Sequence, residues 1–216
     1  MEIDELNKLF KSFCAKGDEV RPVLNNPFVQ ELDGRDAICA TEGHALIIKK
    51  NAVGYESIAA VRSNKPDVSL AIPKDECVHE ITYDMVNSAL GRVPTSNTEY
   101  VECPNCDGFG EVEWNCVDIN GKPHANNFKC PWCYGRGVIK HSCERHLSDN
   151  YFISIDGIPL QLKFTQLLCN ALKCLGTFKC VGCGAHTLKL ENEDYIMMFS
   201  GIWASDDLGT RLIKVL

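Results

Sequence analysis

The chain carries one eight-residue pattern twice, first as Cys103-Pro104-Asn105-Cys106-Asp107-Gly108-Phe109-Gly110 and again as Cys130-Pro131-Trp132-Cys133-Tyr134-Gly135-Arg136-Gly137. The two-residue gap in each C-x-x-C pair lets both thiolates reach one tetrahedral ion. The glycines permit the positive backbone dihedrals with which such a turn aims amide hydrogens at the sulfurs. Four thiolates leave no open coordination position, so the pattern predicts one structural Zn²⁺ held by Cys103, Cys106, Cys130 and Cys133.

The segment between the two cysteine pairs predicts a hairpin. Residues 111–117 can run out as a strand, Asn120-Gly121 can turn the chain, and residues 127–129 can return it. The double motif resembles the cysteine-rich region of J-domain chaperones over residues 103–137. Those proteins carry four copies and a His-Pro-Asp signature, whereas this chain has two copies and no such tripeptide. The resemblance therefore implies a zinc-tied ribbon and does not imply chaperone activity.

Other cysteines and histidines offer a candidate second zinc site. The pair Cys180 and Cys183 has ligand spacing, and Cys143 with His141 or His146 could complete a site with it. Further candidates are Cys116, His124 and His186. The alternative for the pair is a glycine-bearing β-turn with reduced thiols, and the distance in sequence between the pairs favours it. The candidate ligands of a second ion are therefore Cys143, His146, Cys180 and Cys183.

The flanking regions show the same order of elements twice. Apolar spacing predicts an amphipathic helix over residues 3–16, followed by strands at 29–32, 37–40 and 45–48. A second helix is expected over residues 160–175, followed by strands at 187–190, 195–199 and 211–216. The regions between should hold a strand at 68–72, a short helix at 83–90 and a strand at 151–155.

The fold class is therefore α+β, a pseudo-repeat of helix plus antiparallel sheet. Residues 1–98 and 147–216 form one discontinuous domain, and a zinc-binding module of residues 99–146 interrupts it.

Two segments of the flanking regions resemble bacterial DNA polymerase sliding clamps. They are Arg21-Pro22-Val23-Leu24 and the stretch from Ile38 through Thr41-Glu42-Gly43-His44 to Leu46. Further along the chain, Ile155-Asp156-Gly157, the second helix and the last strand are similar to the second half of such a domain. The resemblance implies two helix-plus-sheet halves, helices that face DNA, and a ring of several domains. Ala45 stands where the family has Arg, and the chain has material for one such domain.

The polar face of the second predicted helix has the composition of a DNA-facing surface. It carries Lys163, Gln166, Asn170 and Lys173 and no acidic residue. Such a face can meet phosphates without reading sequence. The alternative is an ordinary solvated helix face.

Composition limits the class of protein. The 216 residues carry a formal charge of -7 with a pI near 5.4, which excludes a basic protein that coats nucleic acid over its whole surface. The chain has thirteen cysteines, an odd number, and its first residues are acidic and amphipathic. We therefore expect a reducing, cytoplasmic location and no disulfide framework. No apolar run approaches the ~20 residues of a membrane span.

These features predict a noncatalytic, zinc-binding, clamp-like protein that associates with DNA or DNA-replication proteins, as a monomer or a homo-oligomer. In this interpretation the zinc ribbon is a rigid contact surface, with Trp114, Phe128 and Trp132 either as its exposed anchors or as its small core. The alternative is a zinc-ribbon adaptor that binds protein partners without touching DNA. An enzyme is the minority interpretation, because the sequence has no phosphate-binding loop, nucleophile elbow or His-Glu-x-x-His helix.

Overall fold

The computed structural model describes residues 3–58, 66–147, 151–184, 186–202 and 211–216, without the side chains of residues 56, 96–99 and 141–147. The chain divides into two compact units, residues 1–93 with 149–216 and residues 94–148. Each unit is described by itself. Within the described residues, no helix combines the length and apolar character that crossing a membrane requires.

The first unit is built on a seven-stranded antiparallel sheet in the order β1-β2-β3-β13-β12-β11-β4. The strands are β1 (Phe28–Leu32), β2 (Arg35–Thr41), β3 (Ala45–Lys49), β4 (His79–Ile81), β11 (Phe178–Cys183), β12 (Thr187–Glu191) and β13 (Tyr195–Ser200). Strands β3 and β13 join the two three-stranded meanders, with Met197 opposite Ile47. Each meander follows a helix, so the predicted α+β pseudo-repeat is confirmed.

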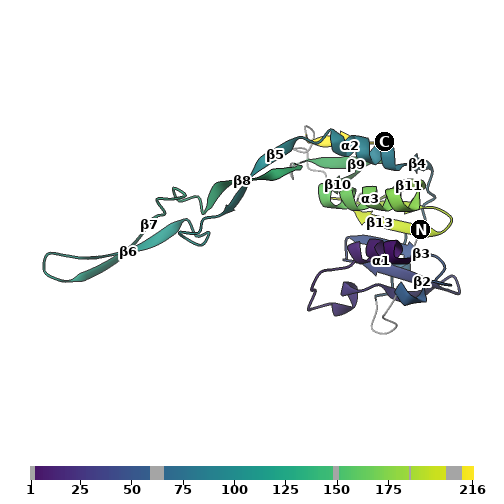
Figure 1. Cartoon of the computed structure of the whole chain (residues 1–216), viewed down its shortest axis with the longest axis horizontal. Helices are drawn as coiled ribbons and strands as arrows, with labels where there is room; N and C mark the ends of the chain where they lie inside the picture. The colour runs from purple at the N-terminus through teal and green to yellow at the C-terminus, as the bar shows by residue number, and fades with distance from the viewer. Residues whose placement is uncertain (1–2, 59–65, 148–150, 185, 203–210) are drawn as a thin grey trace. The chain divides into compact units, whose positions relative to one another are not determined.

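The helices of the first unit are α1 (Ile3–Ser12), α2 (Tyr83–Gly91) and α3 (Leu162–Leu175). Helix α3 contacts both others and lies between them in Figure 1. The fully buried ring of Phe199 on β13 lies 5.8 Å from that of Phe13, just after α1, and 6.5 Å from that of Phe164 on α3. Phe199 therefore contacts aromatic side chains from both halves of the repeat.

The opposite face of the sheet has a second apolar cluster that includes Phe28, Cys39, Ile48 and Met198. Val68 completes this cluster from the connection between β3 and β4. A smaller sheet has the order β10-β9-β14, formed by β9 (Phe152–Ile155), β10 (Ile158–Gln161) and β14 (Leu212–Lys214).

Four local predictions were wrong. The expected last strand at 211–216 spans only Leu212–Lys214 and pairs with β9 in the smaller sheet, so β11 completes the second meander instead. The expected strand at 68–72 is a 3-10 turn, Ser69–Ala71, because the Asp67 carboxylate accepts hydrogen bonds from the Ser69 amide (3.0 Å) and hydroxyl (2.6 Å) and closes the chain locally. The second helix begins at Leu162, since residues 158–161 pair with β9 as a hairpin. The first helix ends at Ser12, short of the expected residue 16. Further short 3-10 turns span Pro22–Asn25 and Glu56–Ile58.

The second unit consists of two strand pairs and the two cysteine motifs. Strand β5 (Thr95–Glu102) pairs with β8 (Val138–Leu147), and β6 (Glu111–Val117) pairs with β7 (Pro123–Lys129) in the hairpin seen in Figure 1. Asp118 closes the hairpin turn, because its carboxylate accepts hydrogen bonds from the amides of Asn120 and Lys122, both at 2.9 Å. The expected outward strand and turn are present, and the returning strand is longer than expected.

Candidate metal centre and apolar pocket

The four cysteines of the repeated motif lie together in the second unit. The Sγ atoms of Cys103 and Cys130 are 3.8 Å apart, as are those of Cys106 and Cys133, and all four lie within 4.8 Å of one another. All four side chains are buried. A tetrahedron with Zn–S bonds of about 2.3 Å has edges of roughly 3.8 Å. The donor set therefore fits a zinc ion, which would hold four thiolates and leave no position for a reacting group.

The two motifs are arranged around the sulfurs in the same way. The amide of Gly110 donates to the Cys106 sulfur and that of Gly137 to the Cys133 sulfur, each at 3.2 Å. The carbonyls of Gly137 and Gly110 accept from the amides of Cys103 and Cys130, each at 2.8 Å, so each motif supports the other. Both glycines have positive φ, +79° and +74°. Such amides stabilise thiolate charge and orient the ligands.

Two thiols of the cluster have shifted acidity. Burial is the main cause that raises the pKa of the Cys106 thiol to about 12. At Cys133 burial acts in the same direction, but the Gly137 amide and the neighbouring thiols outweigh it and lower the pKa to about 7. A metal ion binds thiolates and releases their protons, so the Gly137 amide that favours the Cys133 thiolate also favours metal binding.

The two described cysteines of the candidate second site do not form a ligand pair. Cys180 and Cys183 lie in strand β11, not in a turn, opposite Leu190 and Thr187 respectively. Residues three apart in a strand point to opposite faces of the sheet, so these two thiols cannot coordinate the same ion. The side chains of Cys143 and His146 lie outside the described residues. Within the described residues, the only group of three or more metal-ligand side chains is the four-cysteine cluster.

The predicted DNA-facing residues form one exposed stripe on α3. Lys163, Gln166, Asn170 and Lys173 are all exposed, and Leu168, Ala171 and Leu172 face the core. The Lys163 ammonium lies 4.3 Å from the centroid of the Phe164 ring. No acidic residue occurs anywhere in α3. Sequence periodicity was sufficient to find this face.

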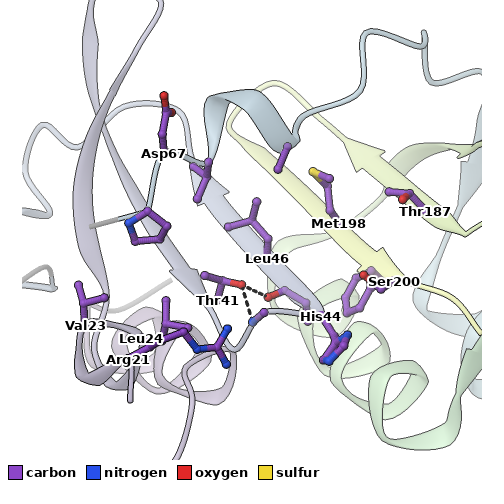
Figure 2. A pocket seen from close by; sticks show the side chains of 16 residues that line it. Arg21, Val23, Leu24, Thr41, His44, Leu46, Asp67, Thr187, Met198 and Ser200 are labelled. Carbon is purple, nitrogen blue, oxygen red and sulfur yellow. Dashed lines mark hydrogen bonds between the residues drawn. The ribbon is translucent and has the colours of Figure 1, made fainter. Parts of the chain in front are cut away.

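The first unit also has an apolar pocket of about 650 Å³ that the sequence did not reveal. Leu46 and Met198 line it from the sheet and Leu24 from the connection after α1, as Figure 2 shows. Val68 lines it from the connection between β3 and β4. Its lining comes from segments far apart in the chain, so no local signal marks it. A mostly apolar pocket with few polar groups is the usual form of a ligand or peptide site.

The turn at the mouth of this pocket is held by its own side chains. The Thr41 hydroxyl donates to the Ala45 carbonyl (2.7 Å) and accepts from the Gly43 amide (3.0 Å), the two bonds drawn in Figure 2. The Glu42 carboxylate accepts from the amides of His44 (2.7 Å) and Ala45 (2.9 Å). These bonds use the backbone amide of His44, and its imidazole lines the pocket.

Comparisons with known proteins give structural neighbours only. No protein-family model and no curated protein matches the sequence. Among solved structures, the chain is similar to DNA polymerase III subunit beta from Borrelia burgdorferi in complex with a natural product (14% identity, 95% of this chain, 64% of that chain, TM-score 0.47). It is also similar to the DNA polymerase sliding clamp from Bacillus subtilis (12% identity, 94% of this chain, 63% of that chain, TM-score 0.46). A third is the DNA polymerase III beta subunit from Thermotoga maritima (11% identity, 95% of this chain, 65% of that chain, TM-score 0.47). The chain thus spans less than two thirds of the length of these bacterial sliding clamps, the type of protein that its flanking motifs resemble.

Proposed function

We propose that this chain is a noncatalytic, clamp-like protein that associates with DNA through helix α3 and carries one structural zinc ion. The observation that carries the proposal is the exposed, acid-free stripe of Lys163, Gln166, Asn170 and Lys173 on a protein whose net charge is -7. A cationic face on an otherwise acidic molecule limits the orientations in which it can approach a polyanion. Amide side chains between the two lysines add hydrogen bonds to phosphate or sugar without sequence readout.

The stripe predicts weak, salt-dependent binding. From Lys163 to Lys173 the helix rises about 15 Å, so the two ammonium groups can reach different phosphates. Two phosphate contacts give a slope of about -1.8 in a plot of log affinity against log salt. Assembly of several copies on one DNA would multiply this number, which connects the proposal to the oligomeric state.

The test is DNA binding measured by fluorescence anisotropy at several salt concentrations. Lys163→Glu with Lys173→Glu should abolish binding to a labelled duplex. The matched control is Lys8→Glu with Lys16→Glu, which changes the same charge at exposed positions in and near α1 and should bind more strongly than the α3 variant. Circular dichroism verifies that both variants fold. Absence of binding by the unmodified protein at low salt would refute the DNA role.

The zinc ion is proposed to hold the two cysteine motifs together at the base of the β6–β7 hairpin. An isolated two-stranded hairpin is marginally stable in water, and every described residue of β6 and β7 except Val112 is exposed. The hairpin therefore needs further stabilisation, which the zinc-bound cysteine motifs would supply at its base. Elemental analysis of purified protein should find one zinc per chain; markedly less than one would contradict this role.

A second candidate function is a protein adaptor, and the aromatic side chains of the second unit favour it. Trp114 is 57% exposed and Phe128 50%, and their ring centroids lie 5.9 Å apart on one face of the hairpin. Trp132 is 61% exposed. Large exposed aromatic side chains are typical anchors of protein interfaces.

The two functions separate in a crossed experiment on one purified replication-protein partner. Trp114→Ala with Phe128→Ala should lower its affinity if the hairpin is the contact, and zinc content should remain unchanged. Lys163→Glu with Lys173→Glu should leave that affinity unchanged. The reverse pattern would assign the contact to α3 and reject the adaptor.

A further inference from the structure

A second cavity of the first unit carries an excess of positive charge. It has a volume of about 550 Å³ and is lined by residues from the β1–β2 hairpin, the residue after β3, strands β12 and β13, and the segment from Ser69 to Lys74. Four basic and two acidic side chains line it: Arg35, Lys50, Lys74 and Lys189 with Asp33 and Glu191. The local net charge is therefore +2 on a chain whose total is -7. We call this cavity the basic groove.

One carboxylate serves two ammonium groups in the wall of the basic groove. The Lys50 ammonium lies 2.7 Å from one oxygen of Glu191, and the Lys189 ammonium lies 3.3 Å from the other. The side chain of Lys189 is only 8% exposed, and those of Lys50 and Glu191 are about one third exposed. Burial raises the pKa of Glu191, but the hydrogen bond and charge of Lys50 and the charge of Lys189 outweigh it and lower that pKa. Glu191 is therefore ionised, and one positive charge remains uncompensated within this trio.

Both ammonium groups keep a hydrogen-bond donor to spare. Each ammonium has three N–H donors. Lys50 uses one on Glu191 and one on the Asn192 carbonyl at 2.7 Å, and Lys189 uses one on Glu191 and one on the Asp75 carbonyl at 2.9 Å. Among the described residues, neither ammonium group has a third acceptor. Water or an anion can accept from the spare donor, and an anion would also compensate the remaining positive charge.

The rim and floor of the basic groove indicate what size and kind of anion it takes. Arg35 and Lys74 are exposed at the rim. Leu32, Ile72 and Ile196 supply an apolar wall. A volume of this size accommodates a small organic ligand rather than an inorganic ion alone.

We propose that the basic groove binds a small phosphate monoester, with the phosphate on the spare donors of Lys50 and Lys189, Arg35 and Lys74 at the rim, and the organic body against the apolar wall. Phosphate matches the site because its several oxygens can accept from both ammonium groups at once. This site is separate from the α3 stripe and from the four-cysteine cluster. It does not depend on the DNA role.

The experiment is isothermal titration calorimetry of the full chain with inorganic phosphate, adenosine monophosphate and adenosine. Adenosine monophosphate should bind and adenosine should not. Binding of the nucleotide at least tenfold tighter than inorganic phosphate would identify an organic phosphate as the ligand, whereas equal affinity would identify the free anion. Equal binding of adenosine and adenosine monophosphate would overturn the proposal, as would binding of neither phosphate.

Two variants locate the binding. Arg35→Ala with Lys74→Ala removes exposed rim cations, so the protein should fold, and phosphate affinity should fall at least tenfold. The control, Lys8→Ala with Lys16→Ala, removes the same charge from exposed positions outside the groove and should bind as the unmodified protein does. Unchanged affinity in the rim variant would reject the site. If the unmodified protein binds a DNA duplex through Arg35 and Lys74 but neither small phosphate, the groove takes a polymer and the proposal fails.

Discussion

Replacing Gly110 with alanine tests whether the glycines of the cysteine motifs are required for metal binding. Gly110 has φ +79°, its amide donates to the Cys106 sulfur, and its carbonyl accepts from the Cys130 amide. A Cβ at this position would lie 2.6 Å from the carbonyl oxygen of Gly135, in the other motif. Gly121 in the hairpin turn has φ +78° and open space around its Cβ position, so it is the matched control.

The two substitutions share one cost and differ in a second. An alanine in the left-handed region costs about 1–2 kcal/mol at either position. At Gly110 the Gly135 carbonyl must also withdraw from 2.6 Å to at least 3.0 Å from the new Cβ. Gly135 lies two residues after Cys133 in the same tight turn, so this movement of about 0.4 Å shifts the turn that positions the Cys133 sulfur. We therefore expect Gly110→Ala to weaken zinc binding at least tenfold relative to Gly121→Ala, a difference of about 1.4 kcal/mol.

The measurement is competition for zinc between each purified variant and a chromophoric chelator at fixed pH. Thermal unfolding of both variants reports whether the first unit remains intact. Equal zinc affinities of Gly110→Ala and Gly121→Ala would show that the motifs absorb the clash without moving the sulfurs. The close packing of the two motifs would then not determine the metal site.

Three further changes probe other parts of the molecule. Phe199→Ala removes the ring that both halves of the repeat contact, and the free energy of unfolding should fall by about 3–5 kcal/mol in chemical denaturation. Removing zinc with a chelator should speed amide hydrogen exchange in residues 103–137 and leave the seven-stranded sheet protected. Unchanged exchange in residues 103–137 would contradict a structural role for zinc. Because Lys50 and Lys189 hold the pKa of Glu191 below its ordinary 4.5, its stabilisation is complete above that pH and is lost as the pH falls through the lowered pKa. Glu191→Gln should therefore flatten the acid side of the stability–pH curve, and an unchanged slope would show that the three charges are not coupled.

Local patterns predicted most of the regular elements but failed where side chains or partner strands decide the backbone. The stretch around Ser69 is apolar enough for a strand, yet the Asp67 side chain closes it into a turn. Leu160 fits the helical spacing of α3, but its backbone pairs with Ile153 in a hairpin. In both cases a contact outside the pattern supplied the deciding hydrogen bonds.

The fate of the cysteines shows the same division. Spacing and glycines identify Cys103, Cys106, Cys130 and Cys133 as a group, because both thiols of each pair lie in one tight turn. Spacing also marked Cys180 and Cys183, but pairing with β12 places them in a strand, which turns their side chains to opposite faces. A two-residue gap has different consequences in a turn and in a strand.

The sequence by itself determined the α+β pseudo-repeat, the four-cysteine group and the polar stripe of α3, because each depends on residues within a few turns or one short motif. Only the tertiary structure decided the apolar pocket and the basic groove. The basic groove, for example, is lined by Arg35 of β2 and Lys189 of β12, which share one sheet only because β3 and β13 join the two meanders. The shared carboxylate of Glu191, and the positive charge it leaves uncompensated beside Lys50 and Lys189, exist only after that joining.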